Sequence, residues 1–274
     1  MKYSNIIILI SISTLLVLTS CEEVIDIDLN YDDPAFVVEA VIYQDSVCRV
    51  RLTRTASFFS MEEPDVIDDA FITLSDETTS EDLQYSGNGY YTGTSITGTE
   101  NSNYEIEIIH DGITYTGVAY MPEKTVFTYL SFDKFEVQST LNPLGETVFT
   151  IICEFRDNPD TDNFYMIKYL ENGRMIESNY FMLTEYDAIG GTFSIEDNII
   201  TFSESIFYEG GEVEVQLFSI DEPVYNYFMQ LNDILFWKRR IMPPTPYNPA
   251  SNISNGALGY FAAWAYDSAI IQLE

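Results

Sequence analysis

The alternation of apolar and polar positions predicts short β-strands over most of the chain. Residues 47–54 alternate cleanly, as expected for a strand with one buried face. The runs 104–109 and 113–119 flank Asp111-Gly112, a dipeptide that supplies the positive-φ residues of a two-residue hairpin turn. These patterns predict antiparallel sheets built from hairpins.

The spacing of the strands in the first half indicates a sandwich. Residues 36–120 hold about seven short strand-like runs, a number typical of immunoglobulin-like folds. The turn sequence Ser-Gly-Asn-Gly at residues 86–89 separates two of these runs. The Cys…Trp…Cys pattern of true immunoglobulin domains is absent from the sequence. We therefore predict an immunoglobulin-like β-sandwich for residues 34–122 from the architecture alone.

Further strand-like runs follow the predicted boundary after residue 122, and one helix interrupts them. The runs occupy residues 126–137, 147–155, 164–170, 175–183, 199–203 and 213–220. Asp221 is a good N-cap, and Pro223 fits the first turn of a helix that we predict at about 222–238. Residues 257–265 and 268–273 are predicted to pair as a closing hairpin.

These elements set the expected fold class. The chain is predicted to be mainly β, with the N-terminal immunoglobulin-like sandwich followed by a second β-rich domain at 123–274 that carries the one helix.

The first residues carry a different pattern. Lys2 precedes thirteen uncharged residues at 6–18, which fits the apolar core of a signal peptide and is short for a membrane-spanning helix. The sequence Leu-Thr-Ser-Cys that ends this run looks like the bacterial lipobox, in which the cysteine takes a diacylglycerol. We predict a lipoprotein signal peptide at 1–20 and a lipidated acidic tether at 21–33 that begins with Cys21. An ordinary secretory signal is the alternative.

The charge balance excludes some classes of partner. The chain has 12 Lys and Arg against 44 Asp and Glu, a formal net charge of −32. Such a surface repels nucleic acid, so we expect no nucleic-acid partner. The 20 Tyr and 18 Phe suit sheets with aromatic cross-strand pairs. The sequence holds no Gly-rich phosphate loop, and we predict no cofactor.

Few residues offer reactive chemistry. Cys48 and Cys153 share strand faces with apolar neighbours, so we interpret them as two buried thiols, with a disulfide as the alternative that a secreted protein allows. His110 flanks a turn, and no nucleophile motif accompanies it, so we interpret it as a surface histidine. No catalytic residue is predicted.

An acidic loop is a weak candidate for a metal site. Asp157, Asp160 and Asp162 lie close together in the sequence and offer the hard oxygen ligands that calcium prefers. Their spacing does not match the EF-hand pattern. A polar loop between two strands explains them without an ion.

Two further groups are candidates for binding. The four residues after the predicted helix form a basic spot that is either a partner contact or a solvated helix end: Trp237, Lys238, Arg239 and Arg240. Eight aromatic residues either stack on sugars and other flat ligands or belong to the core: Tyr90, Tyr91, Tyr225, Tyr227, Trp237, Tyr247, Tyr260 and Trp264.

Several segments together resemble one known family. They are Cys-Glu-Glu-Val-Ile-Asp-Ile-Asp at 21–28, Val-Val-Glu-Ala at 37–40, Asp-Asn-Pro at 157–159 followed by Asn-Phe-Tyr at 163–165, and Asn-Ile-Ser-Asn-Gly-Ala-Leu-Gly-Tyr-Phe at 252–261. Over essentially the whole mature chain the sequence resembles the DUF4249 lipoproteins of Bacteroidota. Ala257 replaces a usual glycine, and residues 262–264 depart from the usual Gly-Ala, which affects the expected turn geometry there.

The resemblance implies a location and a type of partner but no activity. Members of the family are often encoded beside TonB-dependent outer-membrane receptors. Acids just after the lipidated cysteine favour export to the cell surface, and Glu22, Glu23, Asp26 and Asp28 match that character. The protein is therefore expected on the outer membrane, held by lipid, at the cell surface or alternatively on the periplasmic face.

The expected function is non-enzymatic. The first hypothesis is an accessory or ligand-capturing partner of a TonB-dependent transporter, with the ligand unknown. The second is a stand-alone surface module that binds glycans or acts as an adhesin. The third is a hydrolase with an unrecognised pair of acids, because two carboxylates suffice for glycoside hydrolysis.

Overall fold

The strands of the first half form two facing sheets in the computed structural model. This structure describes residues 34–56, 63–137, 146–176, 181–184, 188–189, 192–207, 210–236 and 247–274. One sheet of the sandwich contains β1 (Phe36–Tyr43), β2 (Val47–Arg54), β6 (Tyr90–Thr97) and β5 (Gln84–Gly87), in this spatial order. The other contains β4 (Ser80–Asp82), β3 (Phe71–Ser75), β7 (Ser102–His110) and β8 (Ile113–Met121).

The strand order is that of an immunoglobulin-like sandwich. In one sheet β1, β2, β6 and β5 occupy the places of strands A, B, E and D. In the other β3, β7 and β8 occupy those of C, F and G, with β4 as an added C′. Tyr104, buried near the start of β7, accepts a hydrogen bond from the Thr99 N–H at 2.7 Å, as in the tyrosine corner of such folds. The predicted hairpin turn is confirmed, with φ of 52° at Asp111 and 74° at Gly112. The predicted sandwich is therefore confirmed.

A carboxylate ties the two sheets of this sandwich together. Glu81 in β4 accepts hydrogen bonds from the backbone N–H groups of Thr94, Ser95 and Ile96 in β6, at 2.8 to 2.9 Å. A Cβ added to Gly93 would lie 2.7 Å from the Glu81 Oε1, so a larger residue there would make the Glu81 side chain shift. Partial burial opposes ionisation, but these N–H groups and the Ser95 hydroxyl outweigh it and lower the pKa of Glu81 to about 2.

Replacing Glu81 by glutamine is expected to lower the free energy of unfolding at neutral pH by about 2 kcal/mol, because an ionised acceptor of several N–H bonds is lost. Since the pKa in the folded state lies below its ordinary value of 4.5, the ionised group stabilises the fold above pH 4.5. That contribution is lost as the pH falls toward 2, so the two proteins should converge there. Urea denaturation over this pH range measures the difference. The exposed Glu107→Gln variant is the control, and an unchanged difference across the range would contradict the prediction.

The second half forms another sandwich with a helix on its outer side. A four-stranded sheet contains β15 (Thr192–Glu196), β16 (Ile199–Phe207), β10 (Glu146–Arg156) and β9 (Phe127–Val137) in spatial order. It faces the strands β14 (Ala188–Ile189), β13 (Phe181–Thr184), β11 (Phe164–Glu171) with β12 (Arg174–Met175), β17 (Gly211–Ile220) and β18 (Leu258–Leu273). The core between these layers includes Phe149, Phe155, Tyr165 and Phe202.

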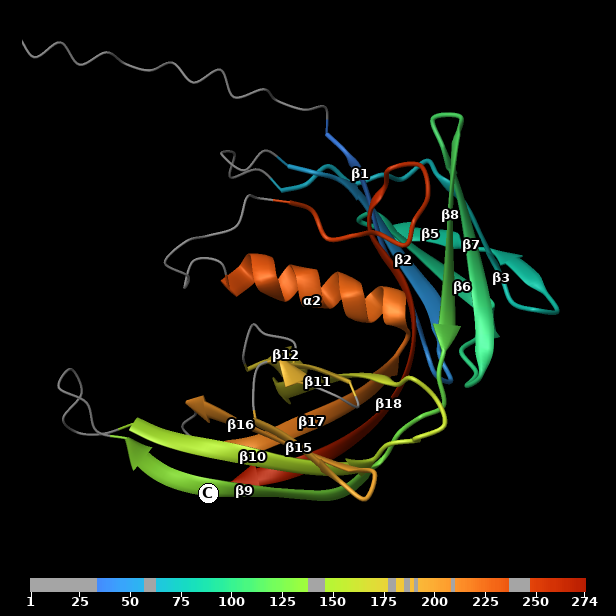
Figure 1. Cartoon of the computed structure of the whole chain (residues 1–274). Coiled ribbons are helices and arrows are strands. Elements are labelled where there is room, and N and C mark those ends of the chain that lie inside the picture. The colour runs from blue at the N-terminus through green and yellow to red at the C-terminus, as the bar shows by residue number, and fades with distance from the viewer. Residues whose placement is uncertain are drawn as a thin grey trace, which may run out of the picture. The chain divides into compact units, whose positions relative to one another are not determined.

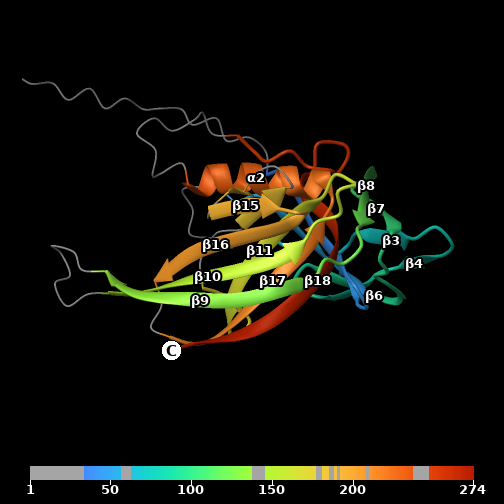
Figure 2. The ribbon, with the colours of Figure 1, turned by 60° about the horizontal axis from the view of Figure 1, so that its bottom comes forward.

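The predicted helix is α2, and it covers the other face of β11 and β17. It spans Glu222–Phe236, and its Val224 and Phe228 pack on Met166, Phe218 and Trp264. Figures 1 and 2 show α2 and the β9–β10 layer on opposite sides of β11. Among the residues that the structure describes, no helix is long and apolar enough to cross a membrane.

The strand β18 joins the two halves into one sheet. Its residues Leu258–Trp264 run parallel to β1, and Ala265–Leu273 run antiparallel to β17. The order β14-β13-β11-β17-β18-β1-β2-β6-β5 is therefore continuous. Pro34–Glu274 pack as one compact unit, and the predicted boundary after residue 122 falls between β8 and β9.

The predicted closing hairpin at 257–273 is wrong. The structure has one strand of 16 residues there, β18, in place of two strands and a turn. Tyr266-Asp267, at the expected reversal, lacks the glycine or asparagine that a tight turn favours. The strand instead changes partner at that point, since Trp264 pairs with Tyr43 and Ala265 with Ser219.

Candidate functional site

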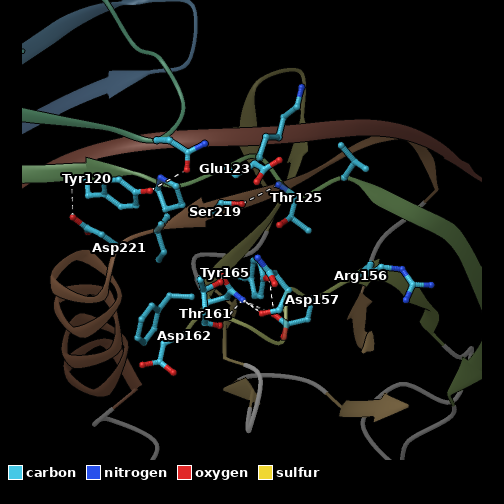
Figure 3. Close-up of a pocket in the computed structure, with 18 of the residues that line it drawn as sticks. Tyr120, Glu123, Thr125, Arg156, Asp157, Thr161, Asp162, Tyr165, Ser219 and Asp221 are labelled. Atoms are coloured by element: carbon cyan, nitrogen blue, oxygen red, sulfur yellow. Dashed lines mark hydrogen bonds between the residues drawn. The ribbon is translucent and has the colours of Figure 1, made fainter. Parts of the chain in front are cut away.

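A pocket of about 750 Å³ opens beside the start of α2. Three segments line most of it, namely residues 120–128 from the end of β8 to the start of β9, 156–165 from the end of β10 to the start of β11, and 219–222 from the end of β17 to the start of α2 (Figure 3). These segments are far apart in sequence, so the pocket is a product of tertiary folding.

The wall at residues 120–128 runs from the end of β8 through an irregular connection into the start of β9, and side chains from elsewhere hold four of its N–H groups. The bonds are Tyr120 N–H to Asp221 at 3.1 Å, Lys124 N–H to Glu100 at 3.1 Å, Thr125 N–H to Ser219 at 3.1 Å and Phe127 N–H to Asp267 at 3.0 Å. Three of the four acceptors are carboxylates. Because a backbone N–H that faces no strand partner must find another acceptor, these side chains take that role.

Asp221 connects this wall to the helix. Its Oδ2 accepts the Tyr120 N–H, and its Oδ1 accepts the Val224 N–H at 3.1 Å, which confirms Asp221 as the N-cap of α2. Burial raises the pKa of Asp221 to about 6, although the hydrogen bonds from the Tyr120 and Val224 N–H groups oppose the shift. A carboxylate that titrates close to neutral pH therefore stands at the edge of the pocket.

Replacing Asp221 by asparagine is expected to flatten the dependence of stability on pH. Since the pKa in the folded state lies above its ordinary value of 3.8, folding favours the protonated form, and stability falls as the pH rises from 3.8 to about 6. Asparagine removes the charge but has one acceptor oxygen where Asp221 uses two, so it loses one of the two N–H bonds and its urea midpoint should stay nearly constant between pH 3.8 and about 6. Urea midpoints measured between these pH values give the comparison. An equal pH dependence in both proteins would contradict the prediction.

The loop at 156–165 is organised around Asp157 and Asn163. Asp157 is buried, and its Oδ1 accepts the Tyr165 hydroxyl at 2.7 Å and the Asn163 Nδ2 at 3.1 Å. The Asn163 Nδ2 also donates to the carbonyl oxygens of Asn158 and Thr161, at 2.7 and 2.9 Å. Hydrogen bonds within the protein therefore hold this loop in its conformation.

The three carboxylates of the calcium candidate do not converge on one point. The Asp157 carboxylate points inward to Tyr165 and Asn163, whereas Asp160 and Asp162 are exposed. Within the described ranges no three His, Cys, Asp or Glu side chains converge as a metal site. The sequence alone showed that the acids were close along the chain, but the direction of each side chain depends on the loop's hydrogen bonds.

The pocket lining mixes polar and apolar residues, and its carboxylates outnumber its bases. Glu123, Asp162 and Glu222 are exposed carboxylates on it, and Lys124 and Arg156 are its bases. The aromatic rings are Tyr120, Phe164 and Tyr165. In Figure 3 Arg156 lies to one side, away from Tyr120 and Asp221. The lining suits a polar ligand that offers hydroxyl or cationic groups.

The predicted surface position of His110 is wrong. His110 is 8% exposed, and its ring stacks on Phe36 at 5.5 Å between centroids. Asp69 and Asp111 each approach one ring nitrogen at 3.2 Å. The turn beside it suggested exposure, but the side chain belongs to the inner face of β7.

The two cysteines are free and buried, as predicted. Cys48 lies in the core of the first sandwich and Cys153 in that of the second. Burial, reinforced by the charge of Glu81, raises the pKa of the Cys48 thiol to about 12. Burial also raises the pKa of the Cys153 thiol to about 12. Neither thiol is suited to nucleophilic chemistry.

The aromatic candidates lie away from the pocket. Tyr91 and Trp264 are buried. Partly buried against the core beside α2 are Tyr225, Tyr227 and Tyr260, and Tyr90 lies under Arg49 at 4.1 Å. None of these residues, nor Tyr247, is among those that line the pocket. The aromatic residues of the lining, above all Tyr120, were not singled out from the sequence, where they look like ordinary strand residues.

Other predicted sites lie outside the described residues. They are Cys21, Glu22, Glu23, Asp26 and Asp28 near the N-terminus, and Trp237, Lys238, Arg239 and Arg240 after α2. Their predicted roles stay predictions.

Comparisons with known proteins give one informative match. Among solved structures, the chain is similar to a chimeric titin Z1Z2-Z1Z2 tandem functionalized with a GRGDS exogenous peptide from fibronectin, at 13% identity over 69% of this chain and 92% of that chain, with a TM-score of only 0.20. No match is found among curated proteins. The profile of a family described as "Domain of unknown function (DUF4249)" matches residues 22–270, which is nearly the whole chain after the predicted signal peptide. The protein belongs to the DUF4249 family.

Proposed function

We propose that the protein is a non-enzymatic lipoprotein of the outer membrane that captures a ligand and assists a TonB-dependent transporter. The observation that carries the proposal is the sequence Leu-Thr-Ser-Cys at 18–21, which ends an uncharged run and is followed by acidic residues. A lipid on Cys21 confines the protein to the membrane plane. This raises its effective concentration near a membrane receptor, so that a modest interface suffices.

The pocket supports binding in preference to catalysis. Its two inward carboxylates, on Asp157 and Asp221, already accept hydrogen bonds from Tyr165, Asn163, Tyr120 and Val224. Both carboxylates therefore stabilise the walls of the pocket. The open, acidic lining then provides the surface for a captured ligand.

Replacing Cys21 by alanine is expected to release the protein from membranes, because each lipid methylene contributes about 0.8 kcal/mol to anchoring and the variant has none. The measurement is the fraction that sediments with membranes after a high-salt wash. Ser20→Ala, which keeps a small residue before the cysteine, is the matched control and should sediment like the wild type. A Cys21→Ala protein that still sediments fully, in cells lacking the neighbouring receptor, would refute the lipid anchor.

The transporter role is tested by purification of the tagged, lipidated protein from detergent-solubilised membranes. A TonB-dependent receptor encoded beside it should co-purify. If the protein elutes alone at its own mass, the proposal fails.

A stand-alone glycan-binding or adhesin-type module is the second candidate. The observation that favours it is the combination of Tyr120 with exposed carboxylates and amides in the pocket lining, which suits hydroxyl-rich ligands. A glycan array would identify such a ligand, and Tyr120→Ala should abolish the signal. Binding that survives this change would place the glycan elsewhere.

A further inference from the structure

The outer face of the β3–β7 sheet carries an exposed apolar pair. Phe71 is 76% exposed, the largest exposure among the large apolar residues of the described chain, and Ile109 is 40% exposed. The two residues are direct cross-strand partners, so their side chains lie together on the same face of the sheet. A phenylalanine left in water beside another apolar side chain marks a contact surface.

The surroundings of this pair are acidic. Glu107 and Glu105 alternate with buried residues along β7, so they share the outer face with Ile109. Asp82 of β4 lies opposite Thr73 on the neighbouring strand and accepts its hydroxyl at 2.9 Å. The nearby base, Arg54, is paired with Asp111 at 3.1 Å. The apolar pair is therefore bordered by carboxylates whose charge is left largely uncompensated.

We propose that this outer face, defined by Phe71, Ile109, Glu105 and Glu107, docks a protein whose contact surface has an apolar recess bordered by Lys and Arg. Aromatic anchors surrounded by polar residues are the arrangement that dominates protein–protein binding energy. The inference rests on the proposed function. It makes this face the surface of the lipoprotein that contacts the transporter.

The charge pattern favours a protein over a lipid surface. Anionic headgroups would be repelled by Glu105 and Glu107, and burial against acyl chains would remove both carboxylates from water without a partner. A protein with a basic border satisfies the carboxylates while it covers the apolar pair. Electrostatic complementarity of this kind also speeds association and makes it sensitive to salt.

The experiment compares variants of the full-length lipoprotein by the amount of receptor that co-purifies from solubilised membranes. Phe71→Ser combined with Ile109→Thr, and separately Glu107→Lys, should each reduce the receptor by about tenfold or more. Ile270→Thr is the matched control, because Ile270 is 65% exposed on β18 in the other half of the protein. All sites are exposed, so urea midpoints should stay unchanged and exclude misfolding as the cause.

A photoreactive residue at position 71 identifies the occupant in intact cells. A crosslink to the receptor, weakened by high salt, supports the inference. A crosslink to lipid, or undiminished receptor in the Phe71/Ile109 variant, would overturn it while the proposed function stands. If the wild type retains no receptor at all, the proposed function fails, and the docking face fails with it.

Discussion

Replacing Gly259 by alanine is expected to prevent the protein from folding. Gly259 lies in the part of β18 that pairs with β1, directly opposite Val38, with φ of +92°. A Cβ at this position would collide with the backbone carbonyl of Val38, which cannot move without breaking the sheet. Conformational strain alone costs about 1–2 kcal/mol, and the collision raises the total above about 4 kcal/mol, a large part of a typical stability.

Gly256 provides the matched control for this change. It also has a positive φ, +76°, but no atom lies within 4 Å of an added Cβ. Gly256→Ala should therefore lose only the strain contribution of about 1–2 kcal/mol and give a folded protein. Circular dichroism and urea denaturation of the two variants separate the effects. Equal losses would show that the close approach to Val38 is not decisive.

Replacing Trp264 by alanine is expected to lower the free energy of unfolding by about 3–5 kcal/mol. Trp264 is 2% exposed, and its ring lies 5.3 Å from Tyr43, 5.4 Å from Phe218 and 6.0 Å from Phe228 of α2. The Lys168 ammonium lies 4.5 Å from the centre of the Trp264 ring. The indole thus fills the space where β1, β17 and the helix meet, and alanine leaves a cavity there.

The Trp264→Phe variant distinguishes packing from a general effect of substitution. Phenylalanine refills most of the space, so its loss should be about 1–2 kcal/mol. Urea denaturation gives both values, and hydrogen exchange of the α2 amides should quicken more in the alanine variant. Similar losses for phenylalanine and alanine would contradict a packing role.

Local signals in the sequence predicted the local structure correctly. Asp111-Gly112 has the backbone preference of a tight turn, and the turn forms. Asp221 followed by Pro223 has the chemistry of a helix start, and α2 begins at Glu222. In each case the deciding interactions lie within a few residues, where a pattern in one sequence can reveal them.

Features that depend on distant segments could not be predicted in this way. The alternation at 258–273 indicates a strand but not its neighbours, so the parallel pairing with β1 was missed and a hairpin was expected instead. The burial of His110 depends on the ring of Phe36, which stacks on it from another strand. The pocket depends on three segments whose residues are unremarkable separately.

The calcium candidate shows that even residues close in sequence can point in directions that the sequence does not reveal. Asp157, Asp160 and Asp162 are close in sequence, but Tyr165 and Asn163 bond to Asp157 and turn it inward. Proximity along the chain does not determine the direction of a carboxylate. The donors that determine the direction of Asp157 are Tyr165 of β11 and Asn163 of the loop before it.

The position of β18 between β1 and β17 has a consequence for the time course of folding. β1 leaves the ribosome long before β18, because the parallel pair joins residues 37–43 to residues 258–264. Until those later residues arrive, one edge of β1 stays open, and the cores that take Phe261, Trp264 and Leu273 stay incomplete. Contacts this distant in sequence make folding slow. The three cores therefore stay incomplete through most of the synthesis of the chain, and they close together once β18 is available.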